Sequence, residues 1–364
     1  MSVLAPVGDP GYRRLRPRLA LAESAGTAFS EDDRLRWHPA AGGLARLHSE
    51  GKVTVLPSVG YSHPDQSHFT SRHFYEVGSL SPGASTGWLG RYLDRVGSSE
   101  NPLQGLTLDS RLAPALATRQ VPVAAVEGPA DYDFWARGVW GEPEEWMLES
   151  MARIGSVQVG DFAREAAGEV AARAGRLREQ LASFGGGSPA GSVTYPDGAG
   201  EPFPRQLASL AAMLEAGLPL RCVALSAPGD YDTHDDQLAD FARDLKLTAD
   251  SLLAFQRDLE VRGLDDRVLV HVWSEFGRRA EENGSRGTDH GAGGAGFVIG
   301  SRVRGRMIGE FPGLGSRGLD GNGNLRATSD FRALYCALLE QWLGADASAI
   351  IPDASRFARP SVVA

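Results

Sequence analysis

The chain has 364 residues, and its 42% hydrophobic and 23% charged content are those of a globular protein with one large core or two ordinary ones. A formal net charge of −9 argues against a nucleic-acid-binding surface, because no basic stripe is available for phosphate contacts. No apolar run reaches the length of a membrane span, and residues 1–30 lack a signal-peptide pattern, so a cytoplasmic protein is expected from the chain as written.

The first clear elements lie between residues 44 and 74. Residues 44–50 read as the end of a helix, and the apolar run 53–59 predicts a strand. That strand leads into a polar stretch, 61–69, in which Ser67 is suited to cap the helix that follows. Residues 1–21 contain a Gly-Asp-Pro-Gly turn with no clear strand before it.

The middle of the chain is looser. A short helix is predicted over 88–96, a strand over 121–126 and a long helix over 161–184, which three glycines then end. Residues 128–158 carry four large aromatic side chains among acids and prolines, which suggests a packed lid or excursion. These four residues are Tyr132, Trp135, Trp140 and Trp146.

The C-terminal half alternates helices and strands. Its predicted helices are 204–216, 236–261 and 329–343, and its predicted strands are 221–226, 268–273 and 296–300. The inner face of the helix 236–261 is expected to consist of Leu238, Phe241, Leu245, Leu252, Phe255 and Leu259. Cys222 and Cys336 read as core residues. The alternation predicts a parallel α/β sheet, most simply three-layered, in a single domain over 1–364, because no repeat and no clean linker is seen.

Polar side chains follow three of the predicted strands. In open α/β sheets, ligands bind outside the carboxyl ends of the strands. Imidazole and carboxylate groups there suit a divalent ion such as Zn or Mn, which can activate water or polarise a phosphoryl oxygen. Asp232 and His234 could supply two ligands and His290 a third. The three groups are Ser67 with His68, Asp232 with His234, and Glu275 with Asp289 and His290.

Each pair also has a structural interpretation. An Asp in a Gly-Asp-Tyr-Asp turn usually hydrogen-bonds its own backbone, and Ser67 is better explained as a helix cap than as a nucleophile. Arg278 could bind an anionic group or lie on a solvated loop, and His271 within its strand is a core or edge residue. Taken together at neighbouring strand ends, the groups favour a functional cleft.

Four phrases, in this order, resemble a known family. YSHPDQSHF, YDTHDDQ, SEFGR and GTDHG look like the DUF1501 family of bacterial proteins, which is related to the alkaline phosphatase/sulfatase superfamily. The resemblance implies a three-layer αβα fold around a mainly parallel sheet, with a metal site at its C-terminal edge. It also implies an opening strand with a Gly-Gly-x-Asp-Gly turn. The chain begins after that point, so the sheet is expected to lack its first strand and the domain to be N-terminally truncated.

The superfamily implies roles for individual residues. A nucleophile falls at or near Ser67, and one metal is held by Asp232, His234 and His290. The second metal usually takes an adjacent Asp-His pair on the strand that here ends in Ser-Glu-Phe-Gly, where Phe276 cannot ligate. A different alignment places that pair at Asp289 and His290, and then no later histidine remains.

The first functional hypothesis is therefore a metal-dependent hydrolase of a small anionic phosphate or sulfate ester. Asp232, His234 and His290 would hold the divalent metal, Glu275 or Asp289 would act as a further ligand or base, and Ser67 would attack or orient water. The alternative is a non-catalytic relative that binds an anionic ligand or a partner protein through a degenerate metal site. Relatives commonly carry a twin-arginine export signal, so a periplasmic or secreted protein is expected if such a signal precedes the chain.

Overall fold

The computed structural model describes residues 1–128, 138–157, 160–182, 184 and 193–364, which form two compact units. Unit 1 comprises residues 1–88, 192–207 and 227–364, and unit 2 comprises 89–191 and 208–226. Tyr132 and Trp135 lie outside the described residues. Whether the two units form a single domain depends on how they associate, so the single domain stays a prediction.

The main sheet of unit 1 is built on β4 (Val53–Gly60), which is buried along its whole length. The strand order is β10-β4-β9-β8, with β8 at Val270–Val272, β9 at Gly294–Ile299 and β10 at Ser329–Asp330. Strand β10 runs parallel to β4, whereas β9 runs antiparallel to both β4 and β8. The strand at 268–273 is thus present but is half-buried and antiparallel to its neighbour, not a buried parallel strand. The reason is the connection from β8 to β9, which contains no helix and lacks the crossover that a parallel pair requires.

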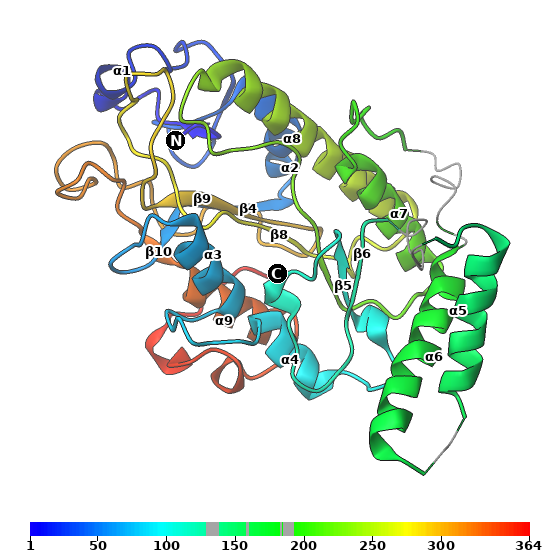
Figure 1. The fold of residues 1–364 in the computed structure, drawn as a ribbon. Helices are drawn as coiled ribbons and strands as arrows, with labels where there is room; N and C mark the ends of the chain where they lie inside the picture. Colours follow the sequence, from blue (N-terminus) through cyan, green and yellow to red (C-terminus); the bar gives the residue numbers. More distant parts are fainter. Residues whose placement is uncertain (129–137, 158–159, 183, 185–192) are drawn as a thin grey trace. The chain divides into compact units, whose positions relative to one another are not determined.

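Helices lie on both sides of this sheet (Figure 1). On one side are α2 (Gly42–Ser49) and α8 (Gln237–Val261), and on the other are α3 (His68–Val77) and α9 (Phe331–Gln341). These helices confirm the predictions from the apolar periodicity. Leu238 of α8 is 53% exposed, however, and its assignment to the inner face is wrong. Helix α2 meets α8 close to Ala249, about three turns further along, so the first turn of α8 lies beyond that contact.

Aromatic rings fill the space between the sheet and the α3/α9 side. The ring of Tyr75 stacks on Phe331 at 4.1 Å and on Trp273 at 5.4 Å between centroids. Burial of this kind supplies most of the stability of short helices, because isolated helices of this length are marginal in water. The helix α3, which begins at His68, is therefore held firmly against the sheet.

A small antiparallel sheet, β1-β3-β2, occupies the N-terminal region of unit 1. Its strands are only two residues long, too short to give a periodic pattern, which explains why the sequence did not reveal them. Trp37 of β3 is buried and contacts Phe297 of β9. The elements are β1 (Leu4–Ala5), α1 (Gly11–Leu15), β2 (Thr27–Ala28), β3 (Arg36–Trp37) and η1 (Pro39–Ala41); the C-terminal turns are η4 (Ala347–Ala349) and η5 (Ala354–Arg356).

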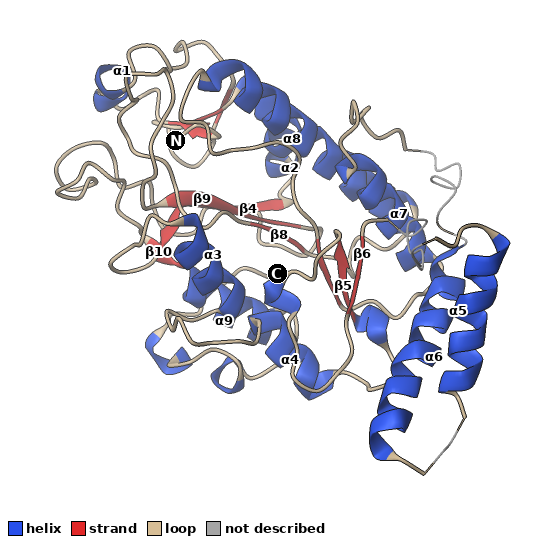
Figure 2. Cartoon of the chain, viewed as in Figure 1, coloured by secondary structure: helices blue, strands red, loops and turns tan. Residues whose placement is uncertain are grey.

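Unit 2 contains a parallel sheet in the order β6-β5-β7 and a helical hairpin of α5 and α6 (Figure 2). Trp140 and Trp146 are 73% and 60% exposed, so the expectation that they anchor a packed excursion is wrong for these two. The elements of unit 2 are η2 (Pro102–Gln104), β5 (Gly105–Leu108), η3 (Pro114–Leu116), β6 (Ala124–Val126), α5 (Glu142–Gly155), α6 (Phe162–Ala182) and β7 (Cys222–Ala224). Two further helices, α4 (Trp88–Val96) and α7 (Phe203–Glu215), each have residues in both units.

The chain is a mixed α/β protein whose sheets combine parallel and antiparallel pairs. The α/β class is confirmed, and the expectation of a mainly parallel sheet is corrected by β9. Cys222 and Cys336 are buried and free, as expected for core residues. Within the described residues, no helix is both long and apolar enough to cross a bilayer.

Candidate metal centre

Three segments of unit 1 reach the same edge of the main sheet. The chain leaves the C-terminal end of β4 and enters α3 at His68, and it leaves β8 towards Glu275. Because β9 is antiparallel to both strands, its N-terminal end lies at this edge too, with Gly294 opposite Val59. The residues just before β9, Asp289 and His290, are thereby brought next to the other two groups.

Asp232 and His234 reach the cluster by a different route from the one expected. The strand before them, β7, belongs to a separate sheet and is not a neighbour of β4 or β8. Instead, the segment before α8 pairs with the loop before β9: Thr288 N donates to Thr233 O at 3.0 Å, and Asp235 forms a β-bridge with Arg286.

Glycines permit this close approach. A Cβ on Gly287 would lie 2.2 Å from the His234 carbonyl oxygen, and a Cβ on Gly277 would lie 1.9 Å from the Gly293 oxygen. Both contacts are too short for any side chain, so glycine is required in each of the two motifs, SEFGR and GTDHG.

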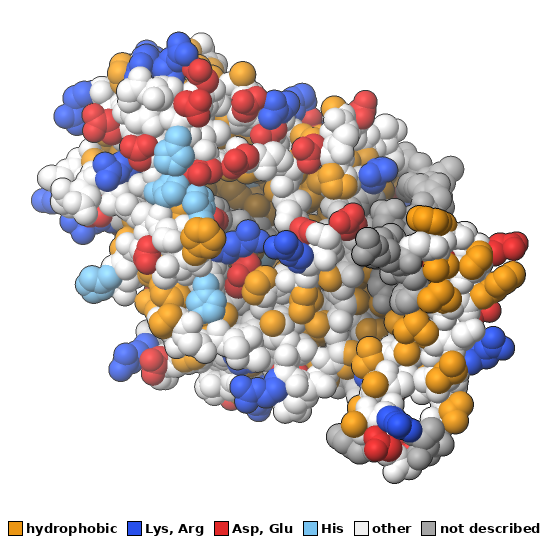
Figure 3. All heavy atoms as spheres, viewed as in Figure 1, with side chains coloured by type: hydrophobic (Ala, Val, Ile, Leu, Met, Phe, Trp, Pro, Cys, Tyr) orange, Lys and Arg blue, Asp and Glu red, His pale blue; other side chains and the backbone are white. Residues whose placement is uncertain are grey.

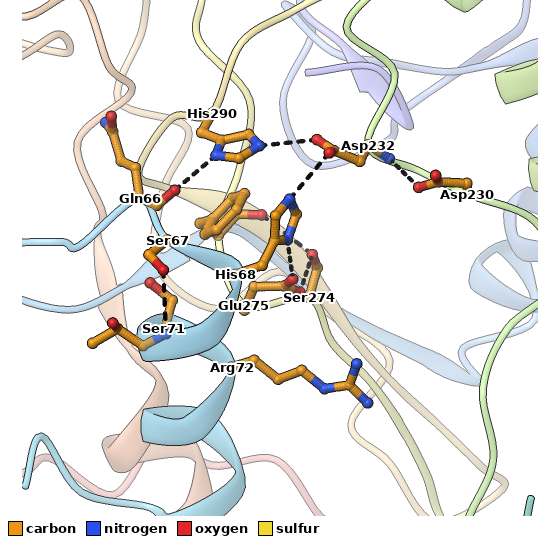
Figure 4. A network of polar contacts seen from close by, with 12 residues as sticks. Gln66, Ser67, His68, Ser71, Arg72, Asp230, Asp232, Ser274, Glu275 and His290 are labelled. Carbon is orange, nitrogen blue, oxygen red and sulfur yellow. Dashed lines mark hydrogen bonds and ion pairs between the residues drawn. The ribbon is translucent and has the colours of Figure 1, made fainter. Parts of the chain in front are cut away.

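The imidazole Nε2 atoms of three histidines converge on one carboxylate (Figure 4, which draws His68 and His290). His290 Nε2 lies 2.9 Å and His234 Nε2 lies 3.0 Å from Asp232 Oδ1, while His68 Nε2 lies 3.2 Å from Asp232 Oδ2. The two atoms His234 Nε2 and His290 Nε2 are 3.0 Å apart.

Each of the three rings is also anchored through its other nitrogen. His68 Nδ1–H donates to Glu275 Oε1 at 2.7 Å, His234 Nδ1–H to Asp289 Oδ1 at 3.1 Å, and His290 Nδ1–H to the Gln66 carbonyl at 2.7 Å. These acceptors place the proton on Nδ1 and leave the lone pair of a neutral ring on Nε2. Three lone pairs then face a carboxylate, which is repulsive unless protons or a cation lie between them.

The carboxylate of Asp232 is held in its charged form. Burial alone would raise the pKa of Asp232, but hydrogen bonds from Arg278 and His290 outweigh it and keep that pKa well below its usual range. Arg278 donates to Asp232 Oδ1 at 2.5 Å. Burial lowers the pKa of His68, but its hydrogen bond to Glu275 and the charge of Asp232 outweigh this, and the net shift is upward. The cluster therefore favours the protonated form of the His68 ring.

The donor set fits a divalent metal ion. One ligand atom from each of His68, Asp232 and His290 lies within 4.8 Å of the others, and two imidazoles with a carboxylate suit zinc or manganese. The buried His68 Nε2 has no hydrogen-bond partner of adequate geometry in the described part of the chain. His234, in contact with His290, lies where a fourth ligand could be offered.

The predicted residues occupy different positions around this centre. Ser67 caps α3, its Oγ accepting from Thr70 N at 3.5 Å, and is adjacent to His68. Glu275 and Asp289 anchor histidine rings through Nδ1. Phe276 is buried, with its ring centroid 4.8 Å from that of His68 and 4.7 Å from that of His290.

Sequence reasoning noted His68 at a strand end but did not assign it to the metal. The available signal was its position at the first turn of a helix that follows a buried strand. The role of the Gln66 carbonyl had no sequence signal, because any residue type supplies a backbone oxygen.

The cluster is accessible to solvent. Between 24% and 43% of the side-chain surface of His68, His234, His290 and Asp232 is exposed. Histidine side chains gather beside acidic ones on the face drawn in Figure 3. The side chains of the cluster are therefore partly exposed, while His68 Nε2 itself is buried.

Residues 161–351 match the family model described as "Protein of unknown function (DUF1501)". The matched segment spans just over half of the chain and includes Asp232, His234, Glu275, Asp289 and His290. No curated protein and no solved structure gives a significant match. The chain belongs to the DUF1501 family.

Proposed function

We propose that the protein is a metal-dependent hydrolase of a phosphate or sulfate ester. The observation that carries the proposal is the arrangement of three imidazoles, each with Nδ1 fixed by an oxygen and Nε2 directed at Asp232. A histidine that binds a metal through one ring nitrogen usually donates the N–H of the other to a carboxylate or a backbone carbonyl. A divalent ion placed between the Nε2 lone pairs and the Asp232 carboxylate would remove their repulsion, and the three rings would not have to be protonated.

The side chains have distinct roles in this proposal. His68, Asp232 and His290 would hold the ion, which when bound supplies Lewis acidity and a bound water of lowered pKa. Arg278 lies beside Asp232 and can donate to an oxygen of an anionic ester. Ser67 is adjacent to the ligand His68 at the N-terminal end of α3, where backbone N–H groups favour an anion, and it would attack or orient water there.

A relation to the alkaline phosphatase/sulfatase superfamily belongs to the same proposal. Helices on both faces of the main sheet and a site at its edge are what a three-layer αβα fold requires. Phe276 packs on His68 and His290, and under this relation it would stand where the superfamily has a ligand of its second metal. We therefore expect one metal ion rather than two.

A second candidate is a non-catalytic protein that binds an anionic ligand. Asp232 Oδ1 already accepts from Arg278, and a protonated His68 beside it would add another positive charge. Arg278 and a protonated His68 would then make the cluster a cationic site for a small oxyanion. The two candidates differ in what they bind at neutral pH, a metal ion in the first and an anion alone in the second.

The test is ester hydrolysis by protein loaded with Zn²⁺ or Mn²⁺, using 4-nitrophenyl phosphate and sulfate with hexose phosphate and sulfate esters. Asp232→Ala and His290→Ala should each lose hydrolysis by at least about 100-fold, since both remove a metal ligand. His73→Ala is the matched control, because His73 lies on α3 outside the cluster. Equal rates in all four proteins, or no hydrolysis by the metal-loaded wild type, would contradict the proposal.

A further inference from the structure

A polar hollow of about 700 Å³ lies in unit 1 next to the candidate metal centre. One wall is the 63–66 loop that leads into Ser67 and His68, and the other is the 320–326 loop. Gln66 is common to both sites, because it lines the hollow while its carbonyl accepts from His290 Nδ1. An ester group at the metal centre would therefore have its organic part within reach of the hollow.

The walls of the hollow offer hydrogen-bond acceptors and donors together. Asp65, Asp320 and Asn322 supply carboxylate and amide oxygens, and Asn322, His63 and Arg326 supply N–H groups. Among its lining residues only Pro64 is apolar. Ligand pockets of this size are usually lined mainly by apolar and aromatic side chains, so this lining indicates an unusually polar ligand.

Several of these groups have hydrogen-bonding capacity left over. Arg326 Nε donates to Leu319 O at 3.0 Å, and in the described part of the chain the guanidinium makes no other hydrogen bond, although its charge acts on Asp320. Within the same residues, the side chains of Asn322 and His63 make no hydrogen bond to protein. By contrast, the Asp320 carboxylate is fixed by the backbone N–H groups of Asn322 and Asn324, so its position is set before any ligand arrives.

The charge of the hollow selects among polar ligands. Asp65 and Asp320 carry two negative charges against the single positive charge of Arg326. A second phosphate or a carboxylate would be repelled there, whereas neutral hydroxyl groups can both donate to the carboxylates and accept from Arg326 and Asn322. An aryl or alkyl group would desolvate these groups without replacing their hydrogen bonds.

We propose that the hollow binds the polyhydroxylated part of the substrate, so that the esters hydrolysed are phosphate or sulfate monoesters of sugars. This inference rests on the proposed hydrolase function. In the reaction, the oxygen of water bonds to phosphorus or sulfur, the bond from that atom to the sugar oxygen breaks, and the sugar oxygen takes up the proton that water loses. The hollow positions the leaving sugar and does not bind the reacting atoms.

The test compares kcat/KM for glucose 6-phosphate and glucose 6-sulfate with cyclohexylmethyl phosphate and sulfate, which have a similar alkyl leaving group but no hydroxyl groups, using metal-loaded protein. The sugar esters should be preferred by about 10-fold, because a site built for hydroxyl groups rejects ligands that lack them. Asn322→Ala and Arg326→Ala should each raise KM for the sugar esters about 5- to 10-fold, with kcat for these esters and hydrolysis of the cyclohexylmethyl esters nearly unchanged, as expected for a lost ground-state hydrogen bond. Arg317→Ala removes the same charge from an exposed position outside the lining and is the matched control.

Preference for the cyclohexylmethyl esters, or equal effects of the variants on both ester types, would overturn the inference while leaving the hydrolase proposal standing. If no ester is hydrolysed, the hydrolase proposal fails. Saturation-transfer NMR with glucose 6-phosphate then tests separately whether the hollow binds a sugar. Binding that Asn322→Ala weakens would support a sugar site, and absence of binding to the wild type would refute it.

Discussion

The loop between β8 and β9 has two polar halves, and they differ in how completely their hydrogen bonds are satisfied. The first half is held by the N-terminal segment. The guanidinium of Arg16, only 1% exposed, donates to Ala280 O at 3.0 Å, to Arg279 O at 2.9 Å and to Ser2 Oγ at 3.0 Å. Glu282 accepts from the Arg18 side chain and from the Leu19 amide. Each of these polar groups is directed at a protein partner.

The second half of the loop carries Asp289 and His290 and contributes to a cluster that the protein alone does not satisfy. His68 Nε2 has no hydrogen-bond partner in the described residues, and the Nε2 atoms of His234 and His290 face each other at 3.0 Å. Satisfied buried networks fix structure, whereas buried groups with unused capacity indicate a ligand. The first half of the loop therefore holds the second in place, and it is the second half that contributes to the proposed metal site.

The largest effect on stability is expected when the hydrogen bonds that hold the first half of the loop are removed. Arg16→Met leaves the carbonyls of Arg279 and Ala280 without donors and should lower the free energy of unfolding by about 3 kcal/mol. Urea unfolding followed by circular dichroism measures this change. Arg13→Ala, at a 57% exposed side chain with one ion pair, should change stability by less than about 0.5 kcal/mol. Equal stability of the two variants would remove the distinction between the halves.

His68→Ala tests the cluster to which the second half of the loop contributes. Losing one ligand should weaken Zn²⁺ binding by at least about 100-fold, measured by competition with a chelator, while the unfolding free energy of the metal-free protein changes by less than about 1 kcal/mol. His73→Ala on the same helix should leave the affinity for Zn²⁺ unchanged. A stability loss in His68→Ala without any loss of metal affinity would mean that the ring is structural.

Glu275→Ala separates the positioning of His68 from ligation. The variant keeps the imidazole but removes the acceptor of its Nδ1–H, and metal affinity should fall about 10- to 100-fold. Glu275→Gln retains an acceptor oxygen and should recover part of the loss. If Gln and Ala behave alike, the charge of Glu275 matters rather than its hydrogen bond.

The smallest effect is a pH dependence at Glu282. Burial would raise the pKa of Glu282, but hydrogen bonds from Arg18 and from the backbone of Leu19 and Arg18 outweigh it, so the folded-state pKa is lowered. The stabilisation is present above the unfolded pKa of about 4.5 and is lost as pH falls through the folded-state value. Wild type should thus lose more stability than Glu282→Gln between pH 6 and pH 3 in urea unfolding, by about 1 kcal/mol or less. Parallel losses would contradict this.

Most elements could be predicted from the sequence because their burial follows a period. Strand β4 and helix α4 begin at the predicted residues, and Ser67 was identified as the cap of α3 from residue type alone. The direction of β9 was not predictable from its composition, because an apolar run of six residues is equally compatible with parallel and antiparallel pairing. The connection before β9 contains no helix, and this was the one available clue.

The candidate site was predicted in part, because it is assembled from distant segments. Asp232 and His290 were singled out by residue type and position, and both lie in the cluster. His68 was missed as a ligand because its ring orientation depends on Glu275, 207 residues away in the sequence. Asp289 was grouped with the ligands, but it anchors His234, and only side-chain geometry distinguishes these two roles.

The most direct test of the central claim is the metal content of the purified protein after loading with Zn²⁺ and desalting, measured by inductively coupled plasma mass spectrometry. We expect close to one equivalent of zinc in the wild type and in Arg13→Ala, and almost none in Asp232→Ala or His290→Ala. A wild type without zinc, or variants that retain as much zinc as the wild type, would contradict it.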